Sequence, residues 1–245
     1  MIRKLAVVFF VCALFAPLLP ASSKPSKPAK GQIVDSGSFT VFVNGARVAT
    51  EKFQIEQKGE GSVATSEVQI EGGAAKMQSE MQLAPNGDLQ RYTWHENSGN
   101  HTVAVIEPSN EFLVEHVTVG ATAKSDETPF LLPHSTLVMD DYFFSHREIL
   151  AWRFLASGCT QGAAGKIECK LGKTQFGVLV PQQRSAMEVS LEFAGREKVT
   201  IRGVERELTR VIIYGDDSEW SLWLDDSNKV VRMLVAGNNT EILRD

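Results

Sequence analysis

The sequence predicts a mainly β protein, in which a curved antiparallel sheet or half-barrel wraps around one central helix. Three observations predict this fold. Apolar and polar residues alternate along many short segments, turn-forming residues separate these segments at regular intervals, and one longer segment is apolar on nearly every side. Alternation with a period of two is typical of half-buried antiparallel strands. A helix that is apolar all round belongs inside a fold.

The N-terminal segment has the features of a secretory signal peptide. Arg3 and Lys4 precede an apolar run from Leu5 to Leu19, and small residues follow at the expected cleavage positions. The run is short for a membrane span. We therefore expect a signal peptide over 1–23, a Lys- and Pro-rich linker over 24–34, and one β-rich domain over 35–245. The mature chain is expected to lack a transmembrane span and to be periplasmic or secreted.

Strands and turns follow the linker in a regular order. Asn44-Gly45 between two alternating segments predicts a type I′ hairpin. Further Gly-, Asn- and Asp-rich breaks predict about seven strands before residue 120 and about seven after residue 173, with one break at Gly195. Residues 120–133 read as a long loop.

One helix is expected at about 141–157. Asp140 or Asp141 is positioned to cap its start, and Gly158 follows its end. Its apolar residues cover most of its circumference, and Trp152 is the largest of them. Because such a helix needs cover on all sides, we expect a single sheet that continues across it.

Two cysteines remain after the leader, Cys159 and Cys169. In an oxidising compartment this pair is expected to form a disulfide. The spacing does not match a two-cysteine redox motif, and no histidine lies nearby.

Composition and motifs argue against several functions. The chain has 25 Lys and Arg against 30 Asp and Glu, and the net charge of −5 is opposite to that of a nucleic-acid binder. No nucleophile motif is found, so the sequence favours a non-catalytic protein without cofactor or metal. The enzyme alternative requires that two or more of four residues meet in a cleft. These residues are Glu51, His134, Asp140 and His146. A metal site from His134, Asp140 or Asp141, and His146 is the corresponding metal alternative.

Methionine and aromatic residues are the candidate ligand contacts, because they adapt to irregular apolar ligands such as acyl chains. The candidates are Met77, Met81, Tyr92, Trp94, Trp152 and Trp223. The alternative is that they form ordinary core. Trp220 and Trp223 should face opposite sides of one late strand.

Two short motifs carry a resemblance. The chain opens its β region with Val41-Phe42-Val43-Asn44-Gly45-Ala46-Arg47-Val48-Ala49, and closes it with Trp220-Ser221-Leu222-Trp223-Leu224-Asp225 followed by Lys229-Val230-Val231-Arg232. This pattern resembles uncharacterised secreted bacterial β-rich families, similar in layout to the lipoprotein carriers LolA and LolB. The resemblance implies a curved sheet around helical elements and a hollow for acyl chains, and it brings no catalytic residue.

The expected function is that of a secreted envelope protein that binds an apolar ligand, either a lipid or an acylated protein. The alternative is a structural or interaction module whose concave face is filled by side chains. An open edge strand at 240–243 would favour that module.

Overall fold

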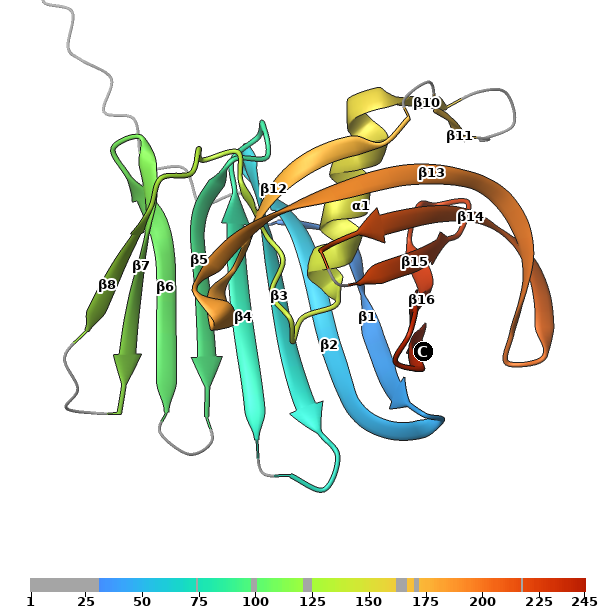
Figure 1. The fold of residues 1–245 in the computed structure, drawn as a ribbon, viewed down its shortest axis with the longest axis horizontal. Coiled ribbons are helices and arrows are strands. Elements are labelled where there is room, and N and C mark those ends of the chain that lie inside the picture. Colours follow the sequence, from blue (N-terminus) through green and yellow to red (C-terminus); the bar gives the residue numbers. More distant parts are fainter. Residues whose placement is uncertain are drawn as a thin grey trace, which may run out of the picture.

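The computed structural model describes residues 31–73, 75–97, 101–120, 125–161, 167–169, 172–216 and 218–245. The expected signal peptide and most of the linker lie outside these residues. One sheet dominates the fold, in the order β8-β7-β6-β5-β4-β3-β2-β1-β17-β16-β15-β14-β13-β12-β9 (Figure 1). It is an open, strongly curved antiparallel sheet, and the predicted fold class is confirmed.

The first part of the sheet is an antiparallel meander. Its strands are β1 (Gln32–Val43), β2 (Ala46–Lys58), β3 (Gly61–Ile70), β4 (Lys76–Leu83), β5 (Leu89–Glu96), β6 (Thr102–Ser109), β7 (Phe112–Val119) and β8 (Asp126–Phe130). Asn44 and Gly45 both have positive φ, 49° and 77°, as a type I′ hairpin requires. The expected long loop at 120–133 contains the edge strand β8, in which Pro129 limits further pairing.

The second part runs back through β12 (Thr174–Val180), β13 (Ser185–Ile201), β14 (Val204–Tyr214), β15 (Glu219–Leu224), β16 (Val230–Val235) and β17 (Thr240–Arg244). The 3-10 helix η2 (Pro181–Gln183) turns the chain between β12 and β13. The break predicted at Gly195 is wrong. Gly195 has φ 97° at a register shift inside the 17-residue β13, so it bends the strand rather than ending it.

The last strand joins the two parts. β17 pairs with β1 on one side and with β16 on the other. Because both sides of β17 are hydrogen-bonded, residues 240–243 do not offer the open edge that would favour the interaction module. At the far end of the sheet, β9 (Leu137–Val138) is a two-residue parallel edge against β12.

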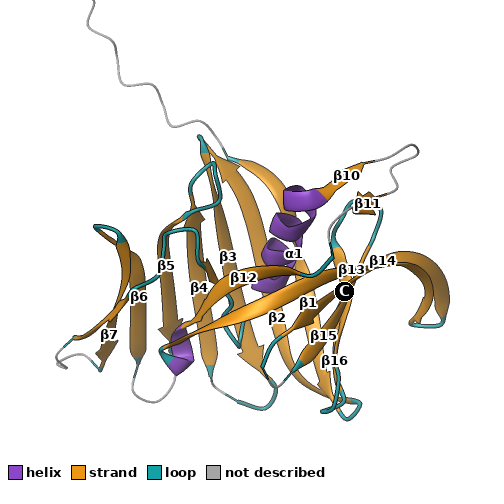
Figure 2. Ribbon diagram, turned by 45° about the horizontal axis from the view of Figure 1, so that its top comes forward, coloured by secondary structure: helices purple, strands orange, loops and turns teal. Residues whose placement is uncertain are grey.

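Helix α1 (Ser145–Gly158) lies inside the curve of the sheet (Figures 1 and 2). Leu150, Ala151 and Phe154 are at most 1% exposed, and they pack in one apolar core with residues of both parts of the sheet. Burial of this kind stabilises by about 25 cal/mol per Å² of apolar surface. In the described part of the chain, no helix is long and apolar enough to cross a membrane.

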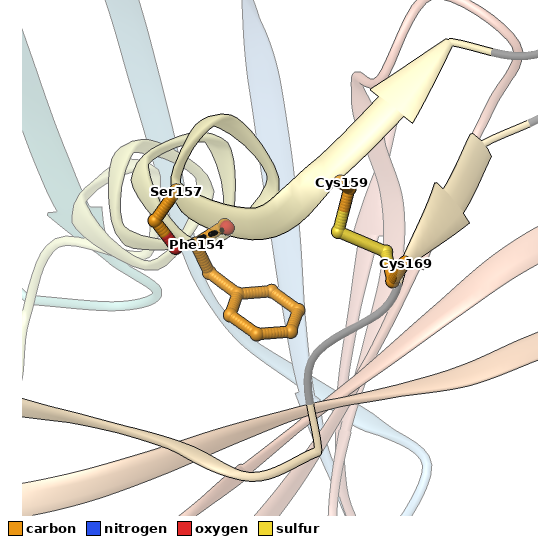
Figure 3. Close-up of a disulfide and its surroundings, with 4 residues drawn as sticks. All are labelled: Phe154, Ser157, Cys159 and Cys169. Carbon is orange, nitrogen blue, oxygen red and sulfur yellow. Dashed lines mark hydrogen bonds between the residues drawn. A yellow bond between two sulfur atoms is a disulfide. The ribbon is translucent and has the colours of Figure 1, made fainter.

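A disulfide follows the helix directly. Cys159 on β10 (Cys159–Gln161) is bonded to Cys169 on β11 (Ile167–Cys169), as predicted (Figure 3). The two strands form a small separate hairpin. In the last turn of α1, the Ser157 hydroxyl donates a hydrogen bond to the carbonyl of Phe154 at 2.7 Å. The disulfide therefore closes the hairpin that directly follows the C-terminal end of the helix.

A second apolar cluster lies on the outer face of the sheet. It consists of Val199, Leu208, Trp223 and Val231. These residues come from β13 to β16, where the long β13–β14 arm curls away from the helix (Figure 1).

Candidate functional site

Glu51 on β2 caps the start of α1 from the sheet. Its Oε2 accepts hydrogen bonds from the backbone N–H groups of Phe144 at 2.7 Å and Ser145 at 3.2 Å. The hydroxyls of Ser145 and Ser66 donate to its Oε1 at 2.7 and 2.8 Å. Burial raises the pKa of Glu51, while these hydrogen bonds oppose that rise. Since a helix start has unpaired N–H groups and favours negative charge, this contact explains an inward-facing carboxylate.

The predicted cap by Asp140 or Asp141 is therefore wrong. The helix begins at Ser145, and Phe144 precedes it without a side-chain cap. Asp140 instead accepts hydrogen bonds from the Tyr92 hydroxyl, the Gln182 amide and the backbone N–H of Tyr142. Burial raises the pKa of Asp140 to about 6. This carboxyl group ties the segment before the helix to β5 and η2.

Three residues of the enzyme alternative, Glu51, Asp140 and His146, are buried at the helix start and do not form an open cleft. The fourth, His134, lies between β8 and β9, where its carbonyl accepts a hydrogen bond from the backbone N–H of Leu89 at 2.9 Å. The backbone N–H of Asp140 donates to His146 Nδ1 at 3.3 Å. Glu51 and Asp140 are fully buried, and His146 is 2% exposed. Burial, together with the charge of Arg147, lowers the pKa of His146 to about 3, so the ring is neutral. Among the residues that the structure describes, no group of three His, Cys, Asp or Glu side chains could hold a metal ion.

A second buried network links the first turn of the helix to the strands that join the two parts of the sheet. Asp35 Oδ1 accepts from Arg244 and from Lys229, both at 2.7 Å. Glu148 on α1 accepts from the backbone N–H of Val230 at 2.9 Å and lies 3.4 Å from Arg244. Burial and the negative charge of Asp35 raise the pKa of Glu148 to about 8. Burial also acts on Asp35, but the hydrogen bonds from Arg244 and Lys229 hold its pKa below the usual value.

An apolar groove opens at the C-terminal end of α1. Its volume is about 360 Å³, within the range of roughly 300–1,000 Å³ that is typical of small-molecule sites. The lining residues are Val34, Trp152, Leu155, Ala156, Cys159, Thr160, Ile167, Ser227, Asn228 and Lys229. The walls therefore come from the helix, the disulfide hairpin, the start of β1 and the turn before β16.

Trp152 is fixed in this groove by a hydrogen bond. Its Nε1–H donates to the carbonyl of Asn228 at 2.6 Å. The ring is partly buried and packs against the main core with one side. A half-buried aromatic residue with a paired N–H is a suitable rigid wall for an apolar ligand.

The other predicted ligand contacts lie elsewhere. Met77, Met81 and Tyr92 are at most 3% exposed in the core between sheet and helix. Trp94 lines a different cavity, together with residues of β6, β7 and η2. The structure thus separates residues that the sequence placed in one group.

The late-strand tryptophans do face opposite sides, as predicted. Trp220 packs against the main core, and the centroid of its ring lies 6.3 Å from the centroid of the Phe144 ring. Trp223 belongs to the outer cluster, where its Nε1–H donates to Glu197 at 2.6 Å. The helix-facing residue of the pair is therefore Trp220.

Several groove residues were missed from the sequence. Val34 is 46% exposed and its neighbour Ile33 is 54% exposed. Two adjacent apolar residues directly after the Lys- and Pro-rich segment were the available signal for an apolar surface. Leu155 and Ile167 gave no such signal, because their place beside Val34 depends on contacts between distant parts of the chain.

Comparisons with known proteins bear on the fold. No protein-family model matches the chain, and no curated protein matches it. The fold is similar to the crystal structure of a β-barrel-like protein from Brucella abortus, which represents a domain of unknown function, DUF1849. The alignment covers 86% of this chain and 94% of that chain, with a TM-score of 0.51 and 9% identity. This likeness supports a β-rich fold of uncharacterised function, and it gives no specific support to a similarity with LolA and LolB.

Proposed function

We propose that this protein is a non-catalytic binding protein of the periplasm or the extracellular space, which holds one acyl chain of a lipid in the groove at the C-terminal end of α1. The observation that carries the proposal is the groove itself. It is bounded on one side by Val34, Trp152 and Leu155, and on the other by the disulfide hairpin. Apolar walls around a preformed cleft are the usual character of small-molecule sites.

The two ends of the groove differ in polarity. Ser227, Asn228 and Lys229 contribute polar groups, whereas the hairpin contributes Cys159, Ile167 and a single polar residue, Thr160. Lys229 is 37% exposed and is paired with the buried Asp35. An amphiphile fits this arrangement with its acyl chain along the helix and its polar head at the turn before β16.

The proposed position of the ligand differs from a hollow beneath the sheet. Large buried side chains, including Met81, Tyr92 and Phe154, fill the space between sheet and helix. Of the predicted ligand-contact residues, we therefore propose that Trp152 contacts the ligand directly. The core residues pack beneath the groove.

The proposed compartment rests on the disulfide and on the expected leader. A disulfide between Cys159 and Cys169 persists in oxidising compartments such as the bacterial periplasm. The bond also fixes the hairpin that forms one wall of the groove.

Palmitate binding to the purified oxidised protein tests the proposal. We expect saturable binding that changes the emission of Trp152. Ala156 is exposed on α1 and lines the groove, so Ala156→Phe should fill the groove without disturbing the core. We expect it to weaken palmitate binding at least about ten-fold, the loss given by about 1.4 kcal/mol.

The matched control is Ala46→Phe, which places the same ring on an exposed position far from the groove. It should bind palmitate as the unchanged protein does. Absence of saturable binding in the unchanged protein, or equal affinity in Ala156→Phe, would contradict the proposal.

A further inference from the structure

A second cavity lies near the other end of α1, on the helix-facing side of β5 to β7. Its volume is about 290 Å³. The turn formed by η2 reaches over this part of the sheet and contributes Pro181, Gln182 and Arg184 (Figure 2). The floor comes from the inward residues of β5, β6 and β7, and Tyr142 completes the wall.

Glu115 on β7 is the unusual residue of this cavity. It lies on the inward face of the strand between Leu113 and Val117, and it is fully buried. Neither of its carboxylate oxygens accepts a hydrogen bond from any residue that the structure describes. A buried carboxylate without partners is unfavourable, and such a group can be compensated by a ligand.

Trp94 adds a second unsatisfied group to the same cavity. It is 8% exposed, and its indole N–H has no acceptor within the described part of the chain. The site therefore offers two unused acceptor atoms and one unused donor. Buried polar groups of this kind are rare in folded proteins and require an explanation.

The charges and rings around the cavity favour a cation. Glu115 and Glu96 are acidic. Arg184 is the cation of the lining, and it attracts the charge of Glu115 and also lies 3.8 Å from Asp126 on β8. Trp94 and Tyr142 provide aromatic faces, which attract ammonium groups. Glu115, whose carboxylate oxygens have no hydrogen-bond partner among the described residues, lines the same cavity.

The hydrogen bonds that the lining can form narrow the class of cation that fits the cavity. A quaternary ammonium has no N–H group and would leave both Glu115 oxygens unpaired, whereas a primary ammonium has three donors. The Trp94 N–H needs an acceptor, which an ammonium group cannot supply. We propose that this cavity binds a primary amine that carries an oxygen atom beside its ammonium group, as a free small molecule or as the head of a lipid. This site is separate from the groove and does not depend on the proposed acyl-chain function.

Calorimetric titration with ethanolamine tests the site, with propylamine and tetramethylammonium as comparison ligands. We expect saturable binding of ethanolamine, about ten-fold weaker binding of propylamine, and weaker binding still of tetramethylammonium. Glu115→Gln should weaken ethanolamine binding about ten-fold or more, since a charge-assisted hydrogen bond is lost. Trp94→Phe should remove the preference for ethanolamine over propylamine.

Two matched variants make the result specific. Glu111→Gln changes an exposed carboxylate in the neighbouring turn and should leave binding unchanged. Val119→Trp places a bulky ring on the partly exposed rim, keeps Glu115, and should also abolish binding. If Glu115→Gln does not fold, Val119→Trp still tests the cavity.

Vesicles distinguish the two sources of the amine. Cosedimentation with phosphatidylethanolamine vesicles, but not with phosphatidylcholine vesicles, would assign the site to a lipid head. Ethanolamine binding without cosedimentation would assign it to a free amine. No ethanolamine binding by the unchanged protein, or equal binding by Glu115→Gln, would overturn the proposal. Palmitate binding should be the same in Glu115→Gln and in the unchanged protein, so the two proposals can fail separately.

Discussion

The two ends of α1 are held by different physical means. At the N-terminal end, Glu51 and Asp140 fix the helix through buried hydrogen bonds to the sheet and to η2. At the C-terminal end, a covalent bond between Cys159 and Cys169 holds a small hairpin beside the helix, and an apolar groove remains open there. The difference shows that buried hydrogen bonds to the sheet set the position of the helix at its start, while the helix leaves an apolar groove open at its end.

The largest expected effect concerns Glu51. Glu51→Ala leaves two backbone N–H groups and two hydroxyls at the helix start without their acceptor. Because breaking a buried network leaves uncompensated polar groups, we expect the free energy of unfolding to fall by about 3–5 kcal/mol. Urea denaturation measures this free energy. The control is Glu60→Ala, which removes a carboxylate from an exposed turn. A loss below about 1 kcal/mol would show that the cap does not hold the helix.

The neutral His146 makes the same end sensitive to acid. Its pKa is about 3 in the folded protein and near 6.5 when unfolded, so the unfolded state takes up the proton first as the pH falls. The contribution of His146 to stability is therefore present above about pH 6.5 and is lost towards pH 3. Between pH 6.5 and 4.5 the loss should be about 2 kcal/mol.

His146→Gln checks this expectation in urea denaturation at several pH values. The variant lacks the titrating ring, so its stability should fall less steeply over this range. Parallel curves for the variant and the unchanged protein would contradict a neutral buried histidine.

The disulfide is the corresponding test at the C-terminal end. Replacement of both Cys159 and Cys169 by serine should lower the free energy of unfolding by about 2–3 kcal/mol, because a short loop is no longer closed in the unfolded chain. The unchanged protein should lose the same amount under reducing conditions. If reduction destabilises the serine variant as well, the effect does not come from this bond.

The smallest expected effect is that of Trp152→Phe. The substitution keeps an aromatic wall in the groove but removes the hydrogen bond to the carbonyl of Asn228. We expect a loss of about 1 kcal/mol, measured by thermal unfolding. A loss as large as that of Glu51→Ala would mean that both ends of the helix are equally important for stability.

Local patterns in the sequence predicted most of the architecture. Alternation at Met77 and Met81 identified β4 with the correct inward face, and Asn44-Gly45 identified a hairpin with the correct turn. The buried character of the helix followed from its apolar residues. Each of these features depends on neighbours in the chain, which is why the sequence reveals them.

The remaining features depend on distant partners. The helix starts later than Asp140 and Asp141 suggested, because the cap comes from Glu51, 93 residues before Phe144. Gly195 bends β13 rather than ending it, since β14 continues to pair across the bulge. The groove brings Val34, Trp152 and Asn228 together from three separate segments. A single sequence gives no direct sign of such contacts.

The position of β17 has a consequence for the order of assembly. Residues of β1 and β17 that meet in the sheet are far apart in the chain. Thr40 on β1 and Asp245, directly after β17, are hydrogen-bonded through their side chains across a separation of 205 residues. Until β17 emerges, β1 exposes an unpaired edge, and β16 does the same. Contacts over such a separation form slowly, and open edges invite association with other chains. The sheet therefore stays incomplete until β17 is available, and β1 and β16 keep their edges exposed during this interval.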